Sequence, residues 1–98
     1  RKMKLHELKI KHEYLIEVDR GRKTFELRKN DRDYQVGDLI HFIDIKDEEK
    51  VFNTWGVEPS IDKDALYKIT YVLKDVPEYG LDKDYCILGI KKLKIDED

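Results

Sequence analysis

Short apolar runs, many of them alternating with polar residues, are separated by polar turns along most of the chain, a pattern typical of β-strands. They predict strands at residues 5–10, 23–29, 39–45, 67–73 and 85–93. Between the first two strands, residues 11–19 predict a short helix, because Tyr14, Leu15 and Val18 share one helical face. Gly21 follows at the position where helices commonly end in a left-handed cap.

The segments between these elements predict turns and one region without a readable pattern. Polar turns are expected at residues 30–34 and 35–38. Residues 46–66 are the least readable, although residues 51–55 suit a further strand. Trp55 is expected either to pack as a core or lid residue or to stack on a nucleic-acid base.

One helix near the start and four to six strands make a mainly β pattern. Strands do not alternate regularly with helices, which disfavours a doubly wound parallel sheet. A small, mostly antiparallel β-barrel with the helix at its N-terminal edge fits better, because closing the sheet protects its edges. In the strand at 67–73, one face is expected to hold Tyr67, Ile69, Tyr71 and Leu73. The 98 residues are expected to form one domain, residues 1–98.

Composition is that of a soluble globular protein, with 40% hydrophobic and 43% charged residues. No apolar run approaches the roughly 20 residues of a membrane helix, and no apolar signal segment follows the first residues, so a cytoplasmic location is expected. Met3 is a candidate natural start, the alternative being a chain cut from a longer one. Cys86, the only cysteine, is expected to be a small buried hydrophobe in a reducing compartment.

The formal net charge of −2 is unevenly distributed along the chain. Residues 1–32 carry a net charge of +5, and residues 33–98 carry −7. Indiscriminate nucleic-acid binding usually needs broad positive charge, so an anionic ligand is expected to be small or held in one local site. No two histidines have the spacing of a metal site, so neither a metal nor another cofactor is expected.

Candidate binding residues are densest at residues 21–28, Gly-Arg-Lys-Thr-Phe-Glu-Leu-Arg. Glu26 and Arg28 are two positions apart, so a strand places them on one face, and Phe25 and Leu27 are expected to point to the core. An arginine held by a carboxylate suits a phosphate or a base edge, and Glu26 suits the exocyclic amine of a base such as cytosine. A solvated surface ion pair is the alternative.

The candidate ligand-binding set is Lys23, Glu26, Arg28, Lys29 and Arg32. Strict alternation places Lys23 away from Glu26, but a twist or bulge after the glycine would turn it to the same side. Its cationic neighbours Arg22 and Arg28 favour the neutral amine, which makes Lys23 the candidate catalytic base or nucleophile. Lys29 and Arg32 lie in or beside a predicted turn. Arg32 is a candidate phosphate contact, and the alternative for both residues is that they are simply solvated.

Gly21-x-Lys23-x-x-Glu26-x-Arg28 resembles the signature of the ASCH domains, which are similar to PUA domains in fold. Further runs resemble, more specifically, a small ASCH-like branch of unassigned function that is found in phages and their bacterial hosts. These runs are residues 6–10, 24–33, 35–38, 79–81 and 87–91. The resemblance therefore covers nearly the whole chain except residues 46–66.

The resemblance implies a PUA-like β-barrel with a cleft between barrel and helix, which the motif residues line and which binds RNA or a modified nucleotide. Some ASCH proteins are amidohydrolases that remove an acyl group from modified cytidine. Their catalytic lysine matches Lys23, but a threonine nucleophile stands where this chain has Glu26. An amidohydrolase is therefore one alternative to a binding module. A phage protein-interaction domain that binds a host protein through the acidic part of the chain is the other.

Overall fold

Five strands and two short α-helices form in residues 1–49 and 60–94, the part of the chain that the computed structural model describes. In chain order the elements are β1 (Leu5–Ile10), α1 (His12–Asp19), β2 (Phe25–Lys29), β3 (Leu39–Asp44), α2 (Ile45–Glu49), β4 (Leu66–Leu73), the 3-10 helix η1 (Pro77–Tyr79) and β5 (Tyr85–Lys92). The five predicted strands and the first helix are thus confirmed, with small shifts at their ends. The pattern did not predict α2. The suggested strand at residues 51–55, and Trp55 with it, lie outside the described residues.

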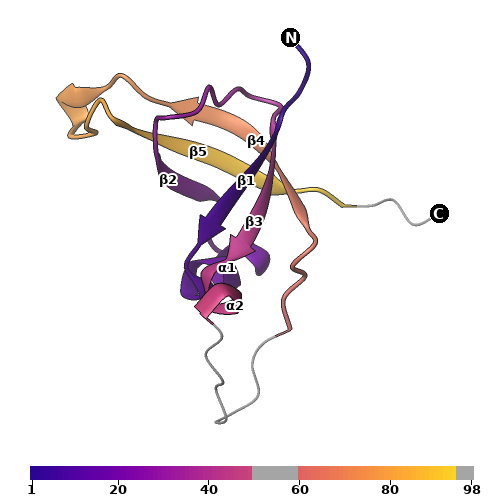
Figure 1. Cartoon of the computed structure of the whole chain (residues 1–98). Helices are drawn as coiled ribbons and strands as arrows, with labels where there is room; N and C mark the ends of the chain where they lie inside the picture. Colours follow the sequence, from indigo (N-terminus) through magenta and orange to yellow (C-terminus); the bar gives the residue numbers. More distant parts are fainter. Residues whose placement is uncertain (50–59, 95–98) are drawn as a thin grey trace.

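The strands form one sheet in the order β1-β3-β4-β5-β2, and this sheet curls into a half-barrel (Figure 1). Three of the four strand pairings are antiparallel, whereas β1 and β3 run parallel, with Leu5 opposite Leu39 and Ile10 opposite Asp44. The sheet is therefore mixed, and the expected antiparallel arrangement holds only in part. Its two edge strands, β1 and β2, do not pair with each other, so the sheet stays open between them. We call this opening the seam.

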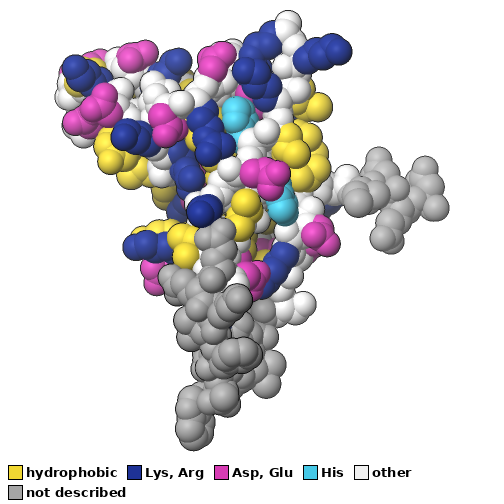
Figure 2. Space-filling view, in the orientation of Figure 1, with side chains coloured by type: hydrophobic (Ala, Val, Ile, Leu, Met, Phe, Trp, Pro, Cys, Tyr) yellow, Lys and Arg dark blue, Asp and Glu magenta, His cyan; other side chains and the backbone are white. Residues whose placement is uncertain are grey.

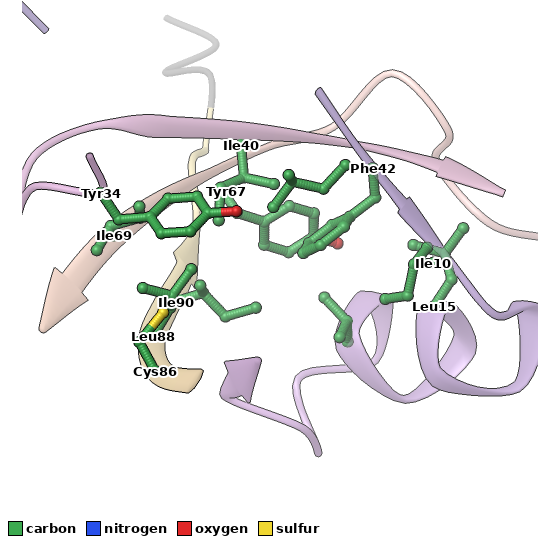
Figure 3. Packing of buried hydrophobic residues seen from close by; sticks show 12 residues of the cluster. Ile10, Leu15, Tyr34, Ile40, Phe42, Tyr67, Ile69, Cys86, Leu88 and Ile90 are labelled. Atoms are coloured by element: carbon green, nitrogen blue, oxygen red, sulfur yellow. The ribbon is translucent and has the colours of Figure 1, made fainter. Parts of the chain in front are cut away.

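The core lies inside the curl of the sheet and follows the strand alternation. In β1, for example, His6, Leu8 and Ile10 are buried and the residues between them are exposed. Helix α1 adds Leu15 and Val18 to the same core (Figure 3). Tyr14, expected on that buried helical face, is instead 45% exposed. Cys86 is a fully buried free thiol within this core, as the apolar run around it predicted.

A β-bulge in β4 interrupts the strand alternation. The four residues expected on one face, Tyr67, Ile69, Tyr71 and Leu73, therefore do not share it. The pairing with β5 shifts between Ile69 and Tyr71, so Thr70 is an extra residue and the alternation changes sides. Tyr67 and Ile69 are buried, whereas Tyr71 is 63% exposed. The prediction of a single shared face was therefore wrong, because a strict period of two assumes an unbroken ladder.

The orientation of β2 is the reverse of the one predicted. Glu26 is only 4% exposed and faces the inside of the half-barrel, whereas Phe25 and Leu27 are 48% and 57% exposed on the outside. Strand alternation correctly predicted that Glu26 and Arg28 share one face. The prediction that the apolar Phe25 and Leu27 face the core was wrong. The reason is that β2 borders the seam, where the interior contains polar groups of β1.

No helix in the described residues is long and apolar enough to cross a membrane. Helix α1, for comparison, has 8 residues.

Candidate functional site

A cleft with a volume of about 460 Å³ lies at the seam, between the end of β1, the start of α1 and β2. Lys9 and Ile10 line it from β1, and Tyr14 lines it from α1. Opposite them lie three of the residues predicted from the motif, Lys23, Glu26 and Arg28. In the space-filling view, Lys and Arg side chains form a band between β1 and β2 (Figure 2). The cleft thus occupies the place where the half-barrel fails to close.

The turn after α1 determines where Lys23 lies. Gly21 has a φ of 76°, which suits glycine, and the backbone N–H groups of Arg22 and Lys23 both donate to the Glu17 carbonyl at 3.0 Å. This turn leaves Lys23 before the first residue of β2, so strand alternation does not govern its direction. Its ammonium forms an ion pair with Glu26 and donates to the Phe25 carbonyl at 2.7 Å. Of the two alternatives that the sequence left open for Lys23, the structure shows the one in which it turns toward Glu26.

The charged neighbours of Lys23 differ from those expected. Arg22 is held by Glu17, to which its Nε and Nη2 donate at 2.6 and 2.7 Å. The Lys23 amino group instead contacts the Glu26 carboxylate and the Phe25 carbonyl. The role of Lys23 as a base or nucleophile stays a prediction.

Glu26 is a buried carboxylate held between two cations. Its Oε1 meets Lys23, and its Oε2 accepts from Arg28 Nη1 at 3.3 Å. The same Arg28 nitrogen donates to the Lys9 carbonyl of β1 at 2.9 Å. Within the described residues, the partners of Arg28 are all reached through Nη1, so Nε and Nη2 remain available as donors. The cleft therefore offers a carboxylate with spare lone pairs beside a guanidinium with spare donors.

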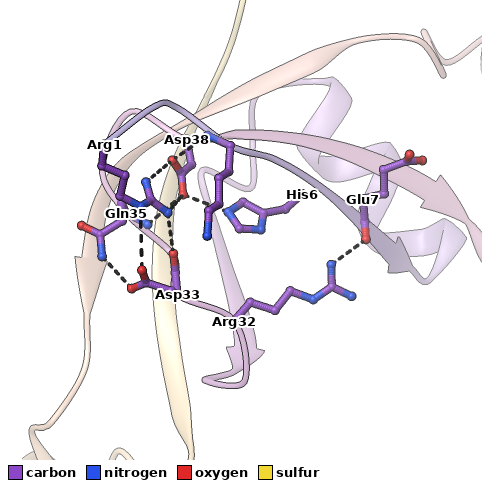
Figure 4. A network of polar contacts seen from close by, with 8 residues as sticks. Arg1, His6, Glu7, Arg32, Asp33, Gln35 and Asp38 are labelled. Atoms are coloured by element: carbon purple, nitrogen blue, oxygen red, sulfur yellow. Dashed lines mark hydrogen bonds and ion pairs between the residues drawn. The ribbon is translucent and has the colours of Figure 1, made fainter.

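The remaining two candidates lie outside the cleft. Lys29 is exposed on the outer face of β2. Arg32, in the loop after β2, is exposed and donates through Nη1 to the Glu7 carbonyl at 3.1 Å (Figure 4). Arg28 and Arg32 thus reach alternate carbonyls of the same edge strand. They bridge the seam with side chains where a closed barrel would have backbone hydrogen bonds.

Tyr14 is the aromatic residue of α1 among the cleft residues that the sequence reasoning missed. The Lys23 ammonium lies 5.5 Å from the centre of the Tyr14 ring and 4.8 Å from that of Phe25. The Lys11 ammonium lies 6.0 Å from the same Tyr14 ring. These distances are in the range of cation–π attraction. Helical periodicity pointed Tyr14 to the core, so only its proximity in sequence to the motif could have suggested this role.

A separate polar network joins the first residues to the turn before β3 (Figure 4). Buried Asp38 accepts from Arg1 Nη1 at 2.9 Å and bonds to His6 Nε2 at 2.9 Å. The backbone N–H groups of Lys4 and Gln35 also donate to it, each at 3.1 Å. Burial alone would raise the pKa of Asp38, but the hydrogen bonds from Arg1 and His6 outweigh it and hold that pKa well below its usual range.

A second buried carboxylate, Asp44, binds His12 Nδ1 at 2.7 Å and accepts from the Lys46 N–H at 3.0 Å. Burial opposes ionisation, but the contact with His12 and the backbone N–H lower the Asp44 pKa overall. Asp38 thus joins the segment before β1 to the turn before β3, and Asp44 joins the end of β3 to α1. Among the described residues, no three His, Cys, Asp or Glu side chains gather in a way that would hold a metal ion.

The fold and the cleft define a small half-barrel protein whose open seam holds a cation-flanked carboxylate. The model of a family described as a domain of unknown function, DUF3850, matches residues 5–90. The chain therefore belongs to this family. No curated protein matches the chain.

Proposed function

We propose that the chain is a binding module for RNA or a modified nucleotide, and that a base of this ligand occupies the cleft at the seam. The observation that carries the proposal is the Lys23–Glu26–Arg28 arrangement, in which a buried carboxylate and a guanidinium line the same cleft. A carboxylate accepts from the exocyclic amine of a base, and a guanidinium donates to ring or carbonyl acceptors or to phosphate. The Tyr14 ring adds an aromatic wall on which a base stacks.

We also infer that the family is a branch of the ASCH domains in the PUA-like superfamily. The motif Gly21-x-Lys23-x-x-Glu26-x-Arg28 supports this inference, because it begins in the turn after a helix and continues along a strand that borders a cleft. A mainly β half-barrel is compatible with such a domain.

Two variants of neighbouring residues test the binding proposal. Arg28→Ala removes a positive charge inside the cleft, whereas Lys29→Ala removes one from the outer face of the same strand. We expect Arg28→Ala to weaken binding of short single-stranded RNA about tenfold, and Lys29→Ala to change it little. Fluorescence anisotropy with labelled RNA, at low and at physiological salt, measures the effect. Equal losses in both variants, or no binding of RNA or nucleosides to the natural chain at low salt, would contradict the proposal.

No observation favours the amidohydrolase alternative over binding. Lys23, the residue that matches the catalytic lysine, uses its ammonium to hold Glu26 and the Phe25 carbonyl. The position of the threonine nucleophile is occupied by Glu26 itself. Incubation with N4-acetylcytidine at high protein concentration, followed by detection of acetate, distinguishes the two functions, and we expect no acetate release.

A further inference from the structure

A second hollow, with a volume of about 390 Å³, lies next to the cleft at the C-terminal end of α1. Its walls come from the end of α1, the turn before β2, and the paired ends of β4 and β5. Lys23 lines both this hollow and the cleft. We call it the basic pocket, because five cationic residues and a single carboxylate line it. The cationic residues are Arg20, Lys23, Lys91, Lys92 and Lys94.

The charge of the basic pocket is only partly balanced by the protein. Asp19, its one carboxylate, already accepts from Lys92 at 2.7 Å, and Lys23 is paired with Glu26. Of the other three cationic residues, Arg20 interacts electrostatically with Glu17, whereas Lys91 and Lys94 form no ion pair with any carboxylate of the described residues.

A buried donor without a partner also lines the basic pocket. Tyr67 is only 2% exposed, and in the described part of the chain its hydroxyl is the one buried side-chain polar atom that lacks a hydrogen bond. Burial, with a smaller contribution from Asp19 and Asp62, raises the pKa of Tyr67 to about 12, so the hydroxyl keeps its proton at neutral pH. Tyr67 is one of the residues that line the basic pocket. An unsatisfied buried hydroxyl is costly, and an oxyanion would satisfy it.

We propose that the basic pocket binds a phosphate group. A phosphate carries several acceptor oxygens and up to two negative charges, which matches a cluster of cations and a buried hydroxyl donor better than a single carboxylate does. The proposal deepens the proposed function and rests on it in one respect. Because Lys23 separates the two hollows, the phosphate is one that belongs to the nucleotide whose base lies in the cleft.

Nuclear magnetic resonance of the labelled chain tests the pocket by itself. Inorganic phosphate, titrated against sodium chloride at constant ionic strength, should shift the backbone amide signals of Gly21, Thr24 and Lys92, and leave that of Gly37 unchanged. Gly37 lies in the turn before β3 and does not line the pocket. No shifts around the pocket, or shifts spread evenly over the surface lysines, would overturn the proposal. Shifts that appear only with an acidic peptide would overturn it as well.

A pair of nucleoside ligands separates this proposal from the proposed function. Cytidine tests the cleft alone, and cytidine 3′,5′-bisphosphate adds phosphate on both sides of the sugar. We expect the bisphosphate to bind at least about tenfold more tightly than cytidine, as one charge-assisted hydrogen bond would give. If cytidine binds and phosphate adds nothing, the pocket proposal fails and the proposed function stands. If inorganic phosphate binds at the pocket but neither cytidine nor RNA binds the chain, the proposed function fails and the pocket remains.

Three variants identify the groups that hold the phosphate. The double variant Lys91→Ala/Lys94→Ala should lose most of the advantage of the bisphosphate and retain the affinity for cytidine. Lys83→Ala, which removes an exposed lysine from the turn before β5, is the matched control. It should change neither the affinity for the bisphosphate nor that for cytidine. Tyr67→Phe removes no hydrogen bond from the free protein, so it should fold with unchanged or higher thermal stability and still bind phosphate several-fold more weakly. If Tyr67→Phe binds phosphate as tightly as the natural chain, the Tyr67 hydroxyl does not contact the phosphate, and the proposed pocket is wrong.

Discussion

At the scale of single residues, Asp38 is a buried charge on which the stability of the fold depends. Its carboxylate accepts hydrogen bonds from the side chains of Arg1 and His6 and from two backbone N–H groups. Together these contacts fasten the segment before β1 to the turn before β3. A buried carboxylate with this many donors stabilises the fold only while it stays ionised.

Acid should therefore unfold the protein partly through Asp38. Its pKa lies below the usual 3.8 in the folded chain, so its contribution to stability is complete at higher pH and is lost as the pH falls through the folded-state pKa. Asp38→Asn should lower the free energy of unfolding at neutral pH by about 3 kcal/mol and flatten its dependence on pH below about 4. Urea denaturation at a series of pH values measures both. Asp33→Asn, at an exposed neighbour, is the control, and an equal effect there would contradict the assignment.

Glu26 shows what residue-by-residue reading of a sequence achieves and where it fails. The spacing of Glu26 and Arg28 predicted their shared face, and the glycine turn allowed Lys23 to join them. The direction of that face was not predictable from apolarity, because it depends on β1, whose carbonyls are bound by Arg28 and Arg32. The grouping of these three candidate residues was thus predictable, but the burial of Glu26 and the position of Tyr14 beside them depend on tertiary contacts.

At the scale of elements, the bulge in β4 and the glycine opposite it depend on each other. A Cβ added at Gly89 would lie 2.9 Å from Thr70 Oγ1 and 3.3 Å from Tyr71 Cβ. The bulge brings both of these residues to the face that Gly89 leaves empty. The sequence indicated the strands themselves through their apolar runs, but it gave no sign that one ladder contains an extra residue. For this reason the faces of Tyr71 and Leu73 were assigned wrongly.

Gly89→Ala should consequently destabilise the protein by about 1–3 kcal/mol through steric overlap. Removing the closest contact as well, in Gly89→Ala/Thr70→Ala, should recover part of the loss. Thermal or urea unfolding of the single and double variants measures this coupling. Strictly additive losses in the double variant would show that Thr70 is not what limits the space at Gly89.

At the scale of the whole molecule, the sheet is a barrel that stops short of closing. Its edge strands β1 and β2 are bridged by the Arg28 and Arg32 side chains, which donate to the Lys9 and Glu7 carbonyls. Side-chain bridges leave room for the cleft, which direct pairing of the two strands would fill. The apolar pattern predicted the strands and hence a barrel. It carries no information about whether the two edge strands of the sheet pair with each other.

Removing both bridges should loosen the seam more than the rest of the sheet. In Arg28→Ala/Arg32→Ala, we expect amide hydrogens of β1 and β2 to exchange about tenfold faster, while those at the centre of β4 and β5 change little. Hydrogen–deuterium exchange resolved by residue measures this difference. The matched double variant Arg22→Ala/Lys29→Ala removes two cations away from the seam and should leave the pattern as it is. Uniform acceleration across all five strands would contradict a local role for the bridges.

The strand order also has a consequence for how the protein is made. Apart from Ile45, the residues that line the cleft all lie within the first 28 residues, yet β1 is held by β3 and β2 is held by β5. A growing polypeptide therefore contains most residues of the cleft before the strands that hold them in place have been made, and the cleft is assembled only after β5 has left the ribosome.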